Sequence, residues 1–282
     1  MTSRALLLSC LSLLGFAGNS LLCRVALKAH EIDAVTFTSL RLTSGALTLW
    51  LLSRKPARAV LTAGSKLSAL ALFLYAAPFS YAYTVLPSGT GALILFGAVQ
   101  STMLGVAVVR GERPGALSVC GFVLALLGLL ALQAPGVSAP SAHGALAMLI
   151  AGIAWGVYSL RGRQAKAPPL VTTAANFALS IPLTLALQAI ALPWLELRLT
   201  MRGAMFALAS GMFASGVGYS LWYAALPSLK ASQAAVMQLL VPVIAAAGGV
   251  WLLDEPLTTR LVLCASVIVL GVVLALPGTA RR

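Results

Sequence analysis

Apolar runs of about 20 residues recur along the whole chain, with only short polar breaks between them. A run of this length is what an α-helix needs to cross the hydrocarbon core of a bilayer. Hydrophobic residues make up 60% of the chain and charged residues 9%, a balance that a soluble domain cannot present to water. We therefore predict an all-α integral membrane protein with ten transmembrane helices, at 5–27, 34–52, 67–86, 88–109, 115–133, 144–160, 170–192, 203–226, 228–253 and 259–276.

The first run resembles a secretory signal peptide, because Arg4 precedes an apolar stretch. The stretch continues beyond a usual signal-peptide core, and no small-x-small cleavage site ends it. We interpret this run as the first transmembrane helix.

Basic residues gather in the breaks, and the formal net charge is +13. With a cytoplasmic N-terminus, thirteen lysines and arginines face the cytoplasm and five face the other side, while Arg41 falls inside a run. The positive-inside rule therefore favours cytoplasmic N- and C-termini. The basic balance is an orientation signal and does not indicate a nucleic-acid-binding surface.

The two halves of the chain repeat one plan. Tyr-Thr-Val-Leu-Pro-Ser at 83–88 matches Tyr-Ala-Ala-Leu-Pro-Ser at 223–228, and 15–24 matches 152–161. The run that follows ends in Glu-Arg-Pro at 112–114 in one half and Glu-Pro at 255–256 in the other. Because each half has five runs, the second half enters the membrane from the opposite side. We predict two inverted repeats, 1–137 and 138–282, suited to alternating access; duplication kept only for packing is the alternative.

The ten-run layout, the two Leu-Pro-Ser junctions and the Glu112 and Glu255 ends resemble the EamA family of the drug/metabolite transporter superfamily, over the whole chain. Within it, the chain most resembles the bacterial YddG-type exporters of aromatic amino acids. The resemblance implies a multi-pass protein of the bacterial inner membrane. It also implies a central cavity surrounded by the first, third, fourth, sixth, eighth and ninth helices.

Aromatic residues lie on one face of the third and eighth predicted helices. Tyr75, Phe79 and Tyr83 follow at i, i+4 and i+8, and Tyr219 and Tyr223 occupy the repeat positions of Phe79 and Tyr83. Aromatic walls with a few polar groups suit an amphiphilic organic solute. We predict that these rings bind substrate, although rings in membrane helices also serve packing or the interfacial belt.

Further candidates are polar or aromatic side chains on the expected cavity helices. Polar side chains at this depth also join helices to one another, so helix packing is the alternative role for each residue taken alone. We include as predicted substrate-binding residues Asn19, Phe96, Gln100, Trp155, Tyr158 and Gln238.

All acidic residues fall in breaks or at the ends of runs, at Glu31, Asp33, Glu112, Glu196, Asp254 and Glu255. An exchanger of protons for organic cations usually keeps a carboxylate within the membrane. Its absence favours facilitated transport of neutral or zwitterionic solutes. Arg41 could meet a substrate carboxylate, but pairing with helix-end carbonyls or snorkelling is the favoured interpretation. Glu112 and Glu255 are expected to cap or position the helix that follows each.

The leading hypothesis is a carrier that exports aromatic or hydrophobic amino acids, or related metabolites, by alternating access. A broad-specificity drug or metabolite efflux carrier is the alternative. A membrane-embedded enzyme is disfavoured, since no nucleophile, base and oxyanion motif occurs. The cysteines and histidines lack ligand spacing, so neither a metal nor a cofactor is expected. The expected partners are a small-molecule substrate and membrane lipid, and the chain could act as a monomer.

Overall fold

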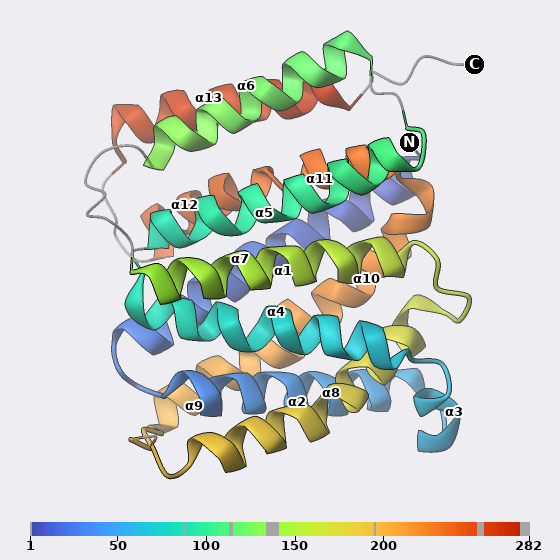
Figure 1. Ribbon diagram of the computed structural model, residues 1–282, viewed down its shortest axis with the longest axis vertical. Helices are drawn as coiled ribbons and strands as arrows, with labels where there is room; N and C mark the ends of the chain where they lie inside the picture. Colours follow the sequence, from blue (N-terminus) through green and yellow to red (C-terminus); the bar gives the residue numbers. More distant parts are fainter. Residues whose placement is uncertain are drawn as a thin grey trace.

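The fold was analysed in a computed structural model, which describes residues 2–86, 88–112, 115–133, 141–194, 196–252 and 257–276. Regular structure within these ranges is helical, and the one β-type contact is an isolated bridge between Ile32 and Leu199. Figure 1 shows the long helices running side by side across the bundle. The predicted all-α class is confirmed for the described residues.

The first half of the chain contains α1 (Ser3–Lys28), α2 (Ala34–Ser53), α3 (Ala57–Leu61), α4 (Lys66–Val85), α5 (Ser88–Val109) and α6 (Ala116–Gln133). The second half begins with α7 (Ala142–Gly162), α8 (Pro169–Ala191) and α9 (Met201–Ala209). It continues with a π-helix (Ser210–Val217), α10 (Gly218–Ala225), a 3-10 turn (Leu226–Ser228), α11 (Ala231–Met237), α12 (Leu240–Leu252) and α13 (Thr259–Ala275).

Seven helical stretches of the described residues are long and apolar enough to cross a membrane. They are Ser3–Lys28, Lys66–Val85, Gly91–Val109, Ala142–Gly162, Pro169–Ala191, Met201–Ser228 and Ala231–Trp251. Two shorter apolar helices are Ala116–Leu132 and Thr259–Ala275. The helix α2 is 20 residues long, but Arg41 and its serines and threonines lower its mean hydropathy. These helices indicate a multi-pass membrane protein.

Side chains at the helix starts supply the hydrogen bonds that the first turn of a helix lacks. The Asp33 carboxylate accepts from the Thr36 N–H at 2.8 Å, and the Thr200 hydroxyl accepts from the Gly203 N–H at 3.0 Å. Thr258 does the same for α13. Each of these helices therefore begins where its sequence places a capping residue.

Two of the predicted helices are interrupted in the structure. The eighth contains the π-helix between α9 and α10, and the ninth breaks at Gln238 and Leu239, between α11 and α12. Pro242 explains the second break, because it lacks the N–H that would bond to the Gln238 carbonyl. The Val241 N–H reaches that carbonyl instead, at 3.0 Å.

Helices from the two halves of the chain pair throughout the bundle. The pair α6 and α13 forms one edge, and α2 and α8 lie together at the other (Figure 1). Between these edges, α1 contacts α10 and α12, while α7 contacts α4 and α5. Small residues permit the α6–α13 contact, since a Cβ at Gly121 would lie 2.5 Å from the Gly271 carbonyl oxygen.

Candidate functional site

Aromatic rings from four helices meet at the centre of the bundle. Trp155 of α7 lies 4.7 Å from Tyr219 of α10 and 4.8 Å from Tyr75 of α4, measured between ring centroids. Phe16 of α1 lies 5.1 Å from Trp155, and Phe79 lies 5.3 Å from Tyr75. All five side chains are buried. We call these residues the aromatic cluster.

Two amides hold members of the aromatic cluster in place. The Trp155 indole N–H donates to the Gln238 side-chain oxygen at 2.5 Å. The Gln238 amide nitrogen in turn donates to the Ala234 carbonyl at 3.1 Å, within the turn before the break between α11 and α12. Asn19 donates to the Tyr75 hydroxyl at 3.4 Å and accepts from the Ser210 hydroxyl at 2.6 Å. Trp155 and Tyr75 are thus each tied to another segment of the bundle through a polar contact.

Arg41 of α2 is completely buried against the aromatic cluster. Its Nη2 donates to the Tyr219 hydroxyl at 2.5 Å and its Nε to the Ser215 hydroxyl at 2.8 Å. The guanidinium carbon lies 5.3 Å from the centroid of the Tyr75 ring and 5.7 Å from that of Phe79. The expectation that Arg41 snorkels or binds helix-end carbonyls is therefore wrong. Two hydroxyls and two ring faces, all from other helices, hold the charge at depth.

A small pocket of about 20 Å³ lies beside the aromatic cluster. Phe16, Tyr75, Phe79, Trp155 and Gln238 line it, together with Ser20, Phe96 and Val241. This is room for about one water molecule, since roughly 10–15 Å³ of such space holds one, and far too little for an organic solute. The centre of the bundle is therefore collapsed in this conformation.

A larger cavity of about 390 Å³ lies beyond the small pocket, and Ser20, Phe96 and Val241 line both. It is formed by the last turns of α1 and α4, the first turns of α5 and α13, and part of α12. These ends lie at the face of the bundle opposite the one where α1 begins. Arg24, Tyr83 and Arg260 line this outer cavity. The centre is thus approached from the face opposite the N-terminus.

Five predicted site residues line neither cavity; Tyr219 belongs to the aromatic cluster and Asn19 contacts it, while the other three lie farther out. Gln100 donates to the Ala235 carbonyl at 2.7 Å and joins α5 to α11, the structural reading that its sequence context left open. The tilted rings of Tyr158 and Tyr223 lie 4.8 Å apart, and the Tyr223 hydroxyl donates to the Tyr158 carbonyl at 3.0 Å. The Tyr158 ring also stacks on Trp155 of the aromatic cluster, at 5.6 Å. They form packing between α7 and α10 in this conformation.

Sequence reasoning missed Phe16 and underweighted Arg41. Phe16 precedes Asn19 by three residues, so it lies near the same side of α1, but a phenylalanine in an apolar run carries no distinguishing signal. Arg41 did carry one, since a charge inside a membrane helix is costly and is usually retained for function.

Polar contacts close the bundle at the face where α1 begins. Arg161 of α7 donates to the hydroxyls of Ser65 and Ser68, at the start of α4, at 2.8 and 2.9 Å. The Ser65 N–H donates to the Asn176 side chain of α8 at 3.2 Å. Both cavities beside the aromatic cluster lie toward the opposite face, so the centre is approached from that side.

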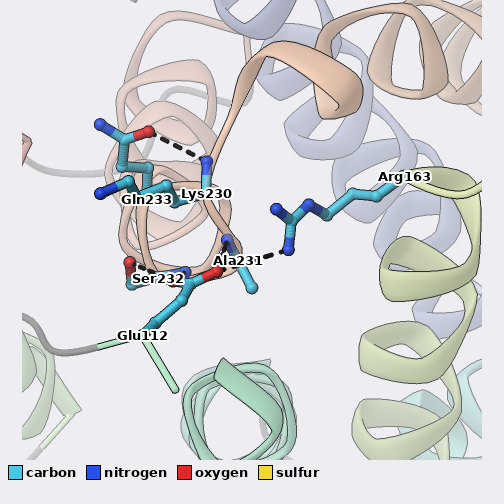
Figure 2. A network of polar contacts seen from close by, with 6 residues as sticks. All are labelled: Glu112, Arg163, Lys230, Ala231, Ser232 and Gln233. Atoms are coloured by element: carbon cyan, nitrogen blue, oxygen red, sulfur yellow. Dashed lines mark hydrogen bonds and ion pairs between the residues drawn. The ribbon is translucent and has the colours of Figure 1, made fainter. Parts of the chain in front are cut away.

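Glu112, in the connection from α5 to α6, belongs to the same closure (Figure 2). Its carboxylate accepts from the Ala231 N–H at 3.0 Å and from the Ser232 hydroxyl at 2.9 Å, with Arg163 at 3.6 Å. Glu112 therefore caps α11 of the other half, a contact that the expectation for the following helix did not include. Glu255, the neighbouring Asp254 and the prolines at 87, 114 and 256 lie outside the described residues.

Charge and hydrogen bonding set the ionisation of Glu112. Partial burial by itself raises the pKa of this carboxyl, but the bonds from Ala231 and Ser232 and the nearby Arg163 outweigh burial. The pKa of Glu112 is therefore lowered below its ordinary value of 4.5. Among the described residues, no group of three or more His, Cys, Asp or Glu side chains could hold a metal ion.

Comparison with known proteins identifies the second half of the chain. Residues 142–276, from α7 to the last turn of α13, match the sequence profile of the EamA-like transporter family. The second half of the chain is thus similar to an EamA-like transporter domain. This domain contributes Trp155, Tyr219 and Gln238 to the centre of the bundle. Its family indicates a membrane transporter of small molecules, which agrees with the apolar helices and with a cavity reached from one face.

Relatives extend the match beyond the EamA-like domain. An uncharacterized protein of Pseudomonas aeruginosa is 54% identical over 261 residues, covering 92% of this chain and 89% of that one, so the two belong to one family. An uncharacterized transporter of Archaeoglobus fulgidus is 29% identical over 188 residues, or 66% of each chain. A protein of known crystal structure has the same fold, with a TM-score of 0.71 at 21% identity over 95% of this chain and 96% of its own. These names specify no substrate, so the closer resemblance to YddG-type exporters remains a prediction.

Proposed function

We propose that this transporter exports aromatic or hydrophobic amino acids, or closely related small metabolites, by alternating access. The observation that carries the proposal is the aromatic cluster, whose rings are accompanied by the amides of Asn19 and Gln238. Rings stack on an apolar side chain, while hydroxyls and amides can bind an amine or a carboxylate. The predicted substrate-binding residues Tyr75, Phe79, Trp155 and Tyr219 belong to this cluster.

Helix contacts support two inverted five-helix halves, residues 1–137 and 138–282, with ten spans. Exchanging the halves converts the α1–α10 contact into the α7–α4 contact, and the α1–α12 contact into the α7–α5 contact; both members of each pair are present. Because the pattern of contacts is unchanged when the two halves are exchanged, the bundle can adopt two equivalent conformations, each open to one face.

Transport in the proposal is facilitated, and the termini lie in the cytoplasm of the bacterial inner membrane. The acids that the structure describes, Glu31, Asp33, Glu112 and Glu196, lie outside its helices, which supports transport without exchange of protons on a membrane carboxylate. With cytoplasmic termini, the cavity at the opposite face belongs to an outward-facing conformation, closed on the cytoplasmic side by Arg161 and Glu112.

Counterflow in proteoliposomes tests the proposal. Vesicles containing the purified protein and unlabelled phenylalanine should accumulate labelled phenylalanine, tryptophan or leucine above protein-free vesicles, without an imposed proton gradient. Trp155→Ala should reduce the rate, because it removes the ring that contacts three other cluster residues. Tyr81→Ala is the matched control, since Tyr81 lies on α4 but is exposed at the bundle surface. Absence of counterflow for every amino acid, in an assay where a control carrier works, would refute the proposal.

A further inference from the structure

Arg41 places a permanent positive charge at the centre of the bundle. Its nearest partners, Ser215, Tyr219 and the rings of Tyr75 and Phe79, are all neutral. The acids within the described residues are at helix starts or in connections at the two faces, and none contacts Arg41. Removing a charge from water is costly unless an opposite charge or hydrogen bonds compensate it. Neutral contacts alone leave the charge itself without a counter-ion in this part of the structure.

The hydrogen-bond donors of the Arg41 guanidinium are not all used. An arginine side chain has five N–H donors in a planar fork. Nε and Nη2 are bonded to the two hydroxyls, while the buried Nη1 has no hydrogen-bond partner among the described residues. An unsatisfied donor at zero exposure is costly in a native protein. The free edge of the fork has the geometry that a carboxylate fills with two parallel bonds.

Arg41 lies directly behind the wall of the small central pocket. Tyr75 and Phe79 line that pocket, and the Arg41 guanidinium lies over the rings of both. A change of side-chain rotamer at either ring would join the pocket to Arg41. A solute whose ring enters the aromatic cluster would then bring a carboxylate attached to it within reach of Nη1.

The route to this centre is also lined by basic residues. Arg24 and Arg260 line the outer cavity, which shares Ser20, Phe96 and Val241 with the central pocket. Neither cavity is lined by an acidic side chain within the described residues. Clefts that carry one sign of charge raise the local concentration of ions of the opposite sign. Two guanidinium groups therefore lie along the path to the centre.

We propose that Arg41 is the carboxylate receptor of the central site and that the substrate class is an organic carboxylate with an apolar body. The carboxylate binds the Nη1 edge of Arg41, and the apolar body binds among Tyr75, Phe79 and Trp155. This inference rests on the proposed transport through the aromatic cluster and narrows its substrate class. A free carboxylate is required, whereas an amino group is not.

Three probes of similar shape separate the role of the carboxylate from that of the amino group. They are phenylalanine, its amide, and 3-phenylpropionate. Binding to the purified parent protein is measured by isothermal titration calorimetry, and transport by competition with labelled phenylalanine in proteoliposomes. Phenylalanine and 3-phenylpropionate should bind at least about tenfold more tightly than the amide, because a charged hydrogen-bonded pair is lost with the carboxylate. Equal binding of phenylalanine and its amide would overturn the inference without any variant being needed.

Variants then assign the discrimination to Arg41. Arg41→Gln should reduce the preference for phenylalanine over its amide to about twofold or less, and Arg41→Lys should keep part of it, because lysine keeps the charge but loses the fork. Ser215→Ala is the matched control, since it removes one bond from Arg41 while the guanidinium stays. If Arg41→Gln and Ser215→Ala lower affinity for all three probes alike, Arg41 is merely structural.

The probe series also separates this inference from the proposed function. Arg41-dependent binding of 3-phenylpropionate without binding of any amino acid would refute amino acid export and leave the carboxylate receptor standing. Equal transport of phenylalanine and its amide would support the carrier and refute the receptor. Absence of binding by every probe, in protein shown to be folded by its cooperative thermal transition, would refute both.

Discussion

At the residue scale, Gly211 determines how closely the π-helix can approach α2. A Cβ built at this position would collide with the Arg41 carbonyl oxygen and the Ser44 hydroxyl. A backbone atom cannot move aside as a flexible side chain can, so Gly211→Ala must push α2 away from Ser215 and Tyr219. We expect the substitution to lower stability by roughly 1–3 kcal/mol, the usual cost of overpacking.

Thermal unfolding in detergent, followed by tryptophan fluorescence, measures this effect. Gly97→Ala is the control, because nothing lies within 4 Å of a Cβ at that position of α5. It should leave the unfolding temperature unchanged or slightly higher, since alanine favours the helix by up to about 1 kcal/mol. Equal unfolding temperatures for the two variants would contradict the contact between Gly211 and α2.

Individual site residues were predictable where the sequence combined a repeat with an unusual side chain. Tyr75 and Tyr219 follow from matching aromatic faces, and their hydroxyls lie 3.2 Å apart in the structure. Phe16 was not predictable, because its role depends on contacts with two other helices, α7 and α10. The surroundings of Arg41 were not predictable either, since Ser215 lies 174 residues away in sequence.

At the element scale, Glu112 connects the loop after α5 to the start of α11 (Figure 2). Glutamine at this position keeps one acceptor and loses the charge, so Glu112→Gln should cost about 1.5–3 kcal/mol, the range for hydrogen bonds to charged groups. Thermal unfolding at neutral pH measures the loss. Glu196→Gln is the control, because Glu196 and its partner Arg198 are exposed and such pairs contribute little.

The difference in stability between the parent protein and Glu112→Gln is expected to depend on pH. The pKa of Glu112 is lower in the folded protein than in the unfolded chain. Its contribution is therefore complete above the ordinary value of 4.5 and is lost as the pH falls through the lower folded value. The difference in unfolding temperature between the parent and Glu112→Gln should be constant from pH 8 to 6 and shrink below about pH 4.5. A difference that grows on acidification would contradict the assigned contacts.

Most helix boundaries were predictable, because apolar runs and capping residues mark them. The predicted helix at 34–52 becomes Ala34–Ser53, with Asp33 as its cap. The interruptions were not predicted. Pro242 breaks its helix but Pro78 and Pro182 lie inside continuous α4 and α8, so a proline in a run does not by itself locate a break. The π-helix leaves no mark in the hydropathy pattern.

At the scale of the whole molecule, the cavity opens at one face only, which predicts one-sided chemical labelling. In a protein whose four cysteines are replaced, Ala246→Cys on the wall of the outer cavity should react with a membrane-impermeant thiol reagent added to intact spheroplasts. Lys166→Cys, in the connection between α7 and α8 at the other face, should react only after permeabilisation. The reverse pattern would show that the termini lie outside.

Hydropathy and the internal repeat together predicted a membrane bundle with a central site, but not its state. Whether the centre is open or collapsed depends on small rotations of packed rings, for which composition and spacing carry no signal. The closure by Arg161 and Glu112 is likewise a matter of which helix ends meet. The sequence does not show which ends meet, because contacting residues such as Glu112 and Ser232 lie 120 residues apart.

The buried charge of Arg41 has an electrical consequence for the proposed carrier. Occupied by an organic anion such as 3-phenylpropionate, the centre is neutral, and its change of access moves little charge; empty, it carries one positive charge through part of the membrane field. A full crossing of one charge is worth about 2.3 kcal/mol per 100 mV. Net efflux of 3-phenylpropionate, which includes the empty step, should therefore respond to a potassium–valinomycin diffusion potential, while exchange at saturating substrate on both sides should not. With Arg41→Gln, the loaded centre carries the negative charge of this substrate, so exchange should become sensitive to the potential.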